Sequence, residues 1–420
     1  MTLSNGLRVL ALEDHTVPTV ALHLLYRAGS RNERPGITGL SHLFEHMMFN
    51  GSARFPPGAF DALIEASGGT SNAFTTPDTT EYHEEFLPAA LDVVLQLEAD
   101  RMRALRLDRR NLEQERAIVK EERRVNTDNS LVGSMSELLW NTAFVAHPYR
   151  WDTIGFMKDL DAIRLEDARA YYRTYYAPNN AVLVLVGAFH TTDLLQKVRR
   201  YFGSIPRQPL PPPVVNSEPP QQGERRANLH RPAELPAVMI GYRVGTYRDP
   251  DAPALELLQG ILSGGESGRL YRQLVYQDQI ATEVWASNEA RKDPGLFTFY
   301  AQARPGRTAA QLEQAIYAVL EDLIRNGVSP RELRKAQNAV RVHFEQRRVT
   351  NSGLAALLAH YEANWGNWRQ MYTFLSRCER VTPAQIRHVA RRVFTERQRT
   401  VVTLIPEQAA VQTTDLRKGK

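Results

Sequence analysis

Apolar residues fall into continuous runs and runs with helical spacing, and the two kinds follow one another in both halves of the chain. Extended apolar runs open each half, at 7–12 and 19–26 in the first and at 237–244 in the second. A β-branched run closes each half, at 181–186 and 400–405, and each follows a helix-like segment. Such short β-branched runs favour strands. We therefore expect an α+β fold with two homologous domains, each a mixed or antiparallel β-sheet packed with helices on one side.

Prolines are concentrated between the two halves, with nine of them from Pro206 to Pro236. Proline fixes φ and lacks a backbone donor, so such a stretch runs extended and unpaired. We expect an N-terminal domain over 1–205, a proline-rich linker over 206–236, a homologous C-terminal domain over 237–406 and a flexible tail over 407–420.

Composition excludes several classes of protein. Apolar residues make up 43% and charged residues 24%, which is globular rather than disordered. No apolar run reaches the roughly 18 residues of a membrane helix, so we expect no membrane span. The net charge of +5 is not gathered in one stripe, so nucleic acid is not an expected partner. The single cysteine, Cys378, rules out a disulfide framework and a cysteine-based zinc finger.

The segment 39–51 carries the clearest chemistry. Its apolar residues recur at helical spacing, and a helix places His42 and His46 on one face about 6 Å apart, with Glu45 nearly beside them. Two imidazoles so placed can share one zinc, and a nearby carboxylate can take a proton from water. The same three residues also occur by chance on amphipathic helices, so the motif needs further support.

A second strong helix former covers 111–124, and it carries Glu115 and Glu122 two turns apart on one face. Here the chain resembles the pitrilysin or insulinase-type zinc metallopeptidases, which include the mitochondrial processing peptidase. In that family an inverted His-x-x-Glu-His motif is followed about 75 residues later by a ligand glutamate, with a second acidic residue seven before it. Other stretches that resemble the family lie at 5–9, 26–33, 69–76, 147–149, 155, 175–180 and 264–271.

The resemblance implies one Zn²⁺ per chain, held by His42, His46 and Glu122, and a metalloendopeptidase. Glu45 would be the general base, and Glu115 would support the ligands from behind. The alternative for Glu115 is a solvated helix charge. Glu121, next to the expected ligand, should point away.

The resemblance also implies that a peptide substrate adds as a strand at Asn72 and Ala73, although Asn72 could be a turn residue. Single-chain and homodimeric relatives carry an Arg and a Tyr in the second domain that grip the substrate. The matching positions here are Val275 and Thr282. We therefore expect this chain to be the zinc-bearing half of a heterodimer whose zinc-free homologous partner supplies both groups. A self-sufficient enzyme and a non-catalytic structural or core subunit are the alternatives.

Other histidines receive no role from the sequence. His23 lies in an apolar strand and is expected to be a core residue, and the spacing of His83 and His147 demands no metal. The chain enters strand-like sequence at once, without a leader. Since bacterial relatives of this size are often exported, we expect a periplasmic protein whose leader was removed, with the cytoplasm as the alternative.

Overall fold

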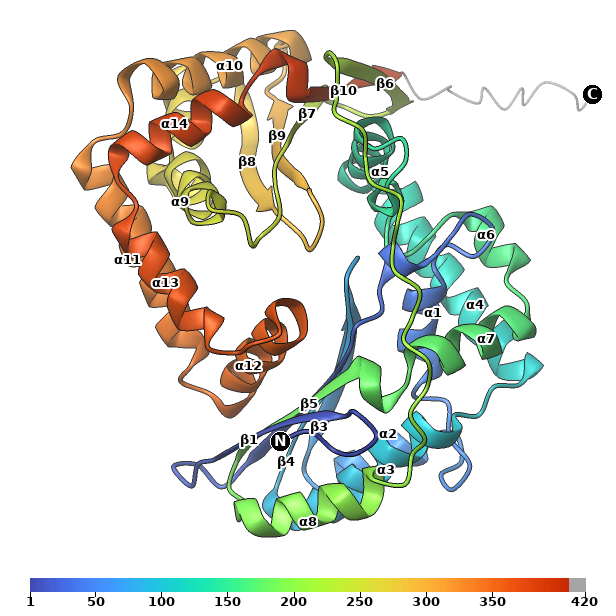
Figure 1. Ribbon diagram of the computed structural model, residues 1–420. Helices are drawn as coiled ribbons and strands as arrows, with labels where there is room; N and C mark the ends of the chain where they lie inside the picture. Colours follow the sequence, from blue (N-terminus) through green and yellow to red (C-terminus); the bar gives the residue numbers. More distant parts are fainter. Residues whose placement is uncertain (408–420) are drawn as a thin grey trace, which may run out of the picture.

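Two five-stranded sheets organise the protein, and the computed structural model describes residues 1–407 (Figure 1). The tail expected over 407–420 lies, apart from Glu407, outside the described residues. The first sheet contains β1 (Arg8–Glu13), β2 (Val20–Tyr26), β3 (Thr70–Thr75), β4 (Thr80–Phe86) and β5 (Ala181–Gly187). The second contains β6 (Arg225–Pro232), β7 (Ala237–Arg243), β8 (Ala281–Glu289), β9 (Leu296–Ala303) and β10 (Arg399–Glu407).

The second sheet repeats the plan of the first. The strand orders are β1-β5-β2-β4-β3 and β6-β10-β7-β9-β8. In each sheet the first pair is parallel and the other pairs are antiparallel. The predicted α+β fold with two mixed sheets is therefore confirmed, and the matching order and direction of the strands agree with the expected duplication.

Helices alternate with the strands along the sequence and cover both sheets. Those of the first half are α1 (Leu40–Met47), α2 (Ala59–Ala66), α3 (Leu91–Ala104), α4 (Arg109–Arg123), α5 (Leu131–Ala143), α6 (Met157–Ala162), α7 (Leu165–Tyr175) and α8 (Thr191–Phe202). Those of the second half are α9 (Ala252–Ser263), α10 (Ala309–Asn326), α11 (Pro330–Arg347), α12 (Asn351–Trp365), α13 (Gln370–Arg380) and α14 (Pro383–Val393).

The two halves exchange one helix each, as Figure 1 shows. Helix α5 belongs to the first half by sequence but packs on the second sheet, where Met135 and Leu139 meet Met239 and Val402. Helix α12 belongs to the second half but packs on strands β2 and β5 of the first sheet. Each sheet therefore has its own helices on one face and a helix from the other half on the opposite face. Since both exchanged contacts are apolar and buried, they hold the two halves together.

The connection between the halves is shorter than the sequence suggests. No helix or strand occupies the part between α8 and β6, and it crosses from one domain to the other (Figure 1). Strand β6 begins at Arg225, inside the stretch that the proline content marks as a linker. Its side chains alternate between half-buried and exposed, and it pairs in parallel with β10. Polar residues on both faces hide such an edge strand from a search for apolar runs.

In the described residues, 1–407, there is no helix whose length and apolar character would let it cross a membrane.

Candidate metal centre

Helix α1 starts where two stretches of backbone pass unusually close together. Gly39 precedes the helix with φ of 88°, and a Cβ there would lie 2.4 Å from the carbonyl oxygen of Ile154. Gly155 has φ of 75°, and a Cβ there would lie 2.3 Å from the backbone nitrogen of Gly39. Only glycine fits both positions, because each combines a left-handed backbone with no room for a side chain. This contact fixes where the helix carrying His42 and His46 begins.

A buried carboxylate caps the same helix. The side chain of Glu33 accepts hydrogen bonds from the backbone N–H groups of Gly39, at 2.8 Å, and Ser41, at 2.7 Å. Burial raises the pKa of Glu33 to about 8. Sequence analysis gave Glu33 no role beyond its place in a family-like stretch, because a cap supplied from outside the helix leaves no local spacing signal.

The second ligand-bearing helix, α4, begins at a regular cap. The side chain of Asp108 accepts from the N–H of Asn111. The apolar residues Leu112 and Val119 are buried, which turns Glu115 and Glu122 toward α1. The predicted helix over 111–124 is thus present, although residues Arg124–Asp128 continue it as a turn of π-helix.

Three expected ligands come together from these two helices. His42, His46 and Glu122 each offer one ligand atom, and these three atoms lie within 4.8 Å of one another. The Oε2 atom of Glu122 is 3.6 Å from His42 Nε2 and 3.4 Å from His46 Nε2. The family resemblance points to Glu122, since 122 − 46 = 76 matches the spacing of the family's ligand glutamate.

The donor set fits a zinc ion. Tetrahedral bonds of about 2.0–2.1 Å place neighbouring donor atoms about 3.3 Å apart. The two separations that involve Glu122 are close to that value. Within residues 1–407, no hydrogen-bond partner reaches Nδ1 of His42. Two imidazoles and one carboxylate are a donor set that divalent zinc accepts, and such a set leaves one position free.

Burial and the nearby carboxylates shift the pKa values of the two histidines in opposite directions. Burial lowers the pKa of His42, although Glu45 and Glu122 oppose this effect. Burial also lowers the pKa of His46, but Glu115 and Glu122 outweigh it and the net pKa is raised. The Oε2 atom of Glu115 lies 3.5 Å from Nδ1 of His46, on the opposite side of the ring from Nε2. Glu115 is therefore placed to orient His46 rather than to share its ligand position.

Glu45 and Glu121 differ in their surroundings. Glu45 lies on α1 between the two histidines in sequence, is half-buried, and its charge acts on both of them. Glu121 has 65% of its side chain exposed and pairs with Arg124 at 2.6 Å. It points away from the cluster, as expected.

Strand β3 lies at the edge of the first sheet, next to α1. In the described part of the chain it pairs only with β4, where Asn72 faces His83 and Ala73 faces Tyr82. Asn72 is exposed, and its side-chain oxygen accepts from the N–H of Ala73 at 2.8 Å. Asn72 is thus part of a strand and not of a turn.

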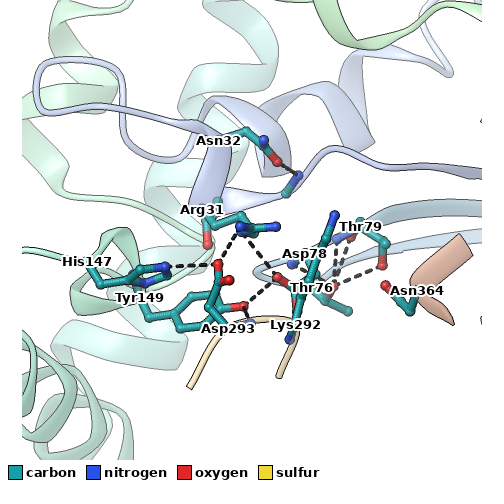
Figure 2. A network of polar contacts seen from close by, with 12 residues as sticks. Arg31, Asn32, Thr76, Asp78, Thr79, His147, Tyr149, Lys292, Asp293 and Asn364 are labelled. Atoms are coloured by element: carbon teal, nitrogen blue, oxygen red, sulfur yellow. Dashed lines mark hydrogen bonds and ion pairs between the residues drawn. The ribbon is translucent and has the colours of Figure 1, made fainter. Parts of the chain in front are cut away.

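A polar network joins the two domains beside this edge strand (Figure 2). It connects the β3–β4 turn, which carries Asp78, to the β8–β9 turn, which carries Asp293. Arg31 pairs with both carboxylates, and His147 Nε2 lies 3.0 Å from Asp293. The hydroxyl of Tyr149 donates to Asp78 at 2.6 Å. The sequence did not reveal this network, because its members come from five separate segments.

Positions 275 and 282, where the resemblance leads us to expect an Arg and a Tyr, lie in the second domain. Val275 is buried in a π-helical segment, Tyr271–Gln277, and Thr282 is exposed on β8. The hydroxyl of Thr282 lies 3.3 Å from the side-chain oxygen of Gln302. Neither side chain carries a positive charge or a phenol.

Comparisons with known proteins agree with this geometry. A family model described as "Insulinase (Peptidase family M16)" matches residues 8–155, which include His42, His46 and Glu122. A second model, "Peptidase M16 inactive domain", matches residues 162–340.

Individual relatives match over most of the chain. "Zinc protease PqqE" of Helicobacter pylori is 34% identical over 86% of this chain and 82% of its own. A probable beta subunit of the mitochondrial-processing peptidase of Arabidopsis thaliana is 25% identical over 97% of this chain and 78% of its own.

Solved structures share the fold. The crystal structure of a protease from Helicobacter pylori has a TM-score of 0.93 at 32% identity, covering 97% of this chain and 98% of that one. The periplasmic protease PqqL of Escherichia coli has a TM-score of 0.79 at 18% identity, and the match covers 97% of this chain but 47% of PqqL.

Proposed function

The chain belongs to the insulinase (M16) family of peptidases, and from that premise we propose that it is a zinc-dependent endopeptidase that acts as the catalytic subunit of a heterodimer. The observation that carries the proposal is the convergence of His42, His46 and Glu122 from two helices. The chemistry of the donor set and the spacing of its atoms support zinc as the ion. Curated relatives that carry the name zinc protease support it as well.

Each residue has a distinct task in this proposal. Zinc, when bound, polarises the scissile carbonyl and makes water more acidic. Glu45 accepts a proton from the attacking water and returns it to the nitrogen of the leaving amine. Glu115 holds the ring of His46 in the orientation that leaves Nε2 free for the metal.

An extended peptide is the substrate class that fits the edge of the first sheet. A peptide that adds to β3 as a strand uses its own backbone groups, so its side chains matter little for binding. The side chain of Asn72 must then release the N–H of Ala73. Folded proteins present few free strands, and we therefore propose peptides and unfolded segments as substrates.

A heterodimer is supported by what the second domain lacks. Val275 and Thr282 cannot bind a carboxylate or a developing oxyanion as an arginine and a tyrosine can. The match to PqqL covers only about half of that chain, so a larger assembly of two such units is compatible with the fold. We propose a zinc-free homologue of similar length as the partner. The periplasm, named for PqqL, is the compartment we propose, and cell fractionation tests it against the cytoplasm.

A non-catalytic subunit is the second candidate. The match of residues 162–340 to a domain described as inactive supports this candidate. The presence of Val275 and Thr282, where the resemblance leads us to expect an Arg and a Tyr, supports it as well. The two candidates differ in one expected outcome. A non-catalytic subunit binds zinc but cleaves no peptide, whichever partner is added.

The decisive test compares two glutamine variants, assayed together with a copurified partner on an unstructured peptide. Glu45→Gln should keep its zinc and lose peptide cleavage by a factor of about 10²–10⁴. Glu121→Gln, which alters an exposed neighbour of the ligand, should keep both zinc and cleavage. Absence of zinc from the wild-type protein by elemental analysis contradicts the proposal, and so does full cleavage by Glu45→Gln.

A further inference from the structure

A second group of possible ligands lies on the opposite face of the first sheet from α1. It consists of His23 on β2 and Glu81 and His83 on β4, and one ligand atom from each lies within 4.8 Å of the others. His23 and His83 are directly paired across the two strands, and their rings stack with centroids 5.3 Å apart. Because side chains alternate along a strand, Glu81 shares their face of the sheet.

The exchanged helix α12 covers this group. Ala21 and Leu25, the neighbours of His23 on the same face of β2, pack in the cluster that α12 completes. The hydroxyl of Ser352, in the first turn of α12, lies 3.3 Å from Nε2 of His23. The group therefore sits where the second half of the chain touches the first sheet.

The polar atoms here are poorly compensated. His23 and Glu81 are each 3% exposed. The Nδ1 atom of His23 lies 2.5 Å from a carboxylate oxygen of Glu81, and within residues 1–407 this is the one ion pair that Glu81 makes. Nδ1 of His83 is buried, and no described residue offers it a hydrogen bond.

Glu84, another buried acid of β4, lies on the opposite face of the sheet and can be compared with Glu81. Glu84 faces the helical core and is fully buried, and the guanidinium of Arg101 lies 3.1 Å from one of its oxygens. Arg101 also pairs with Glu98, and no described residue bonds the other oxygen of Glu84. Glu81 faces α12 and has only an imidazole. Burying a carboxylate without a cation beside it costs free energy of folding, and a bound metal ion is one of the few groups that can offset this cost.

We propose that His23, Glu81 and His83 form a second metal site, which takes a divalent transition ion of the zinc class. Two imidazoles and one carboxylate are its donors, and the hydroxyl of Ser352 lies 3.3 Å from Nε2, the other ring nitrogen of His23. The ion replaces the proton shared by His23 and Glu81 and gives His83 Nδ1 a partner. Its role is structural, because it ties β2 to β4 beneath the helix that joins the two halves. This inference does not depend on peptidase activity.

The sequence predicted that His23 is a core residue, and its side chain is indeed buried. Its neighbours along β2 and its partner Val184 on β5 are apolar, but its partner His83 on β4 is polar, and strand pairing is not visible in one segment. A third group, Glu13, His15 and His190, is exposed on the surface, and Glu13 is already bonded to Thr191. We assign no ion to it.

The test counts zinc in the full chain, purified without a metal-binding tag, equilibrated with zinc and desalted. The wild type should hold two ions. His46→Ala and His83→Ala should each hold one, and the double variant should hold none. His230→Ala, at an exposed histidine on β6, should keep two. Because His83 is only half-buried, His83→Gln provides a second variant that preserves its size.

A second measurement covers the structural role. Added zinc should raise the melting temperature of His46→Ala and should leave the double variant unchanged. One ion in the wild type and none in His46→Ala overturns the proposal. The group of His23, Glu81 and His83 then binds no ion, and His23 and Glu81 are joined by their hydrogen bond alone. Two ions that persist in His83→Ala overturn it as well. One ion that survives His46→Ala but not His83→Ala supports this site and contradicts the catalytic one.

Discussion

Glu115 supports the metal centre without being one of its expected ligands. Its carboxylate lies 3.5 Å from the ring nitrogen of His46 that faces away from Glu122. Replacement by Gln removes the charge that orients the ring, so Glu115→Gln should weaken zinc binding by about 10–100-fold. Competition with a coloured chelator measures this. Glu113→Gln, at an exposed site on the same helix, is the control. Glu115 is only 5% exposed, so the alternative of a solvated helix charge is wrong, and unchanged affinity in both variants would show that this buried carboxylate does not support the ligands.

Single residues show which parts of the site a sequence can predict. His42 and His46, and likewise Glu115 and Glu122, lie within one helix each, so helical periodicity fixes their common face. Joining the two helices required a family-like spacing. Glu33 was not found, because its partners are backbone groups that every residue carries.

At the scale of elements, helix α11 shows how a cap and an ion pair are combined. Glu332 completes the capping box with Ser329 and pairs with Arg269, which lies just before the π-helical segment Tyr271–Gln277. Arg269 and the Ser329 N–H lower the pKa of Glu332 from 4.5 to about 2. The stabilisation is therefore present above pH 4.5 and is lost as the pH falls toward 2.

Glu332→Gln should remove this acid-dependent part of the stability. Gln keeps the capping geometry but not the charge. Because the side chain is 35% exposed, solvent screening leaves a difference of about 1 kcal/mol above pH 5. Urea unfolding from pH 2 to 7 measures it, and the wild type and variant should converge at the acid end. Glu345→Gln alters an exposed pair on the same helix and should follow the wild-type profile.

Elements differ in how well the sequence predicts them. The apolar strands β2, β5, β7 and β10 are buried and were recognised from their runs. Strand β6 was missed, because its burial alternates and half of its residues are polar. The extension of α4 as a π-helix was also missed, since a change of hydrogen-bond pattern from i−4 to i−5 leaves no clear mark in composition.

At the scale of the whole molecule, the network around Arg31 holds the β3–β4 turn against the second domain. Asp293→Asn removes the charge that faces Arg31 and His147, and leaves a guanidinium that is 9% exposed with a weaker partner. We expect a loss of about 1–3 kcal/mol in the free energy of unfolding. Hydrogen exchange in the β3–β4 turn should also accelerate. Asp322→Asn, at an exposed ion pair, is the control, and equal effects of the two variants would show that the network does not join the domains.

The exchange of α5 and α12 explains why the domain plan was visible in sequence but the packing was not. The strands repeat in order, so their apolar runs recur in both halves. The two helices contact sheets that are more than 80 residues distant along the chain, and Met135 and Leu139, for example, share one buried cluster with Met239 and Val402. Amphipathic spacing predicts that a helix will be buried, but not on which sheet.

The two exchanged helices make one chain a single unit, and the heterodimer proposal therefore takes the Arg and the Tyr from a separate molecule. The chain alone offers Val275 and Thr282 at the positions where charge and a phenol are needed, and we expect slow cleavage from it. Adding a zinc-free homologue should raise turnover until the two chains are equimolar, because each complex contains one metal centre. A titration at fixed concentration of this chain measures the plateau. In the partner, replacement of the matching Arg by Ala should abolish the gain, whereas Thr282→Ala in this chain should change nothing. Full turnover by this chain alone, proportional to its concentration down to high dilution, would show that it carries a complete site.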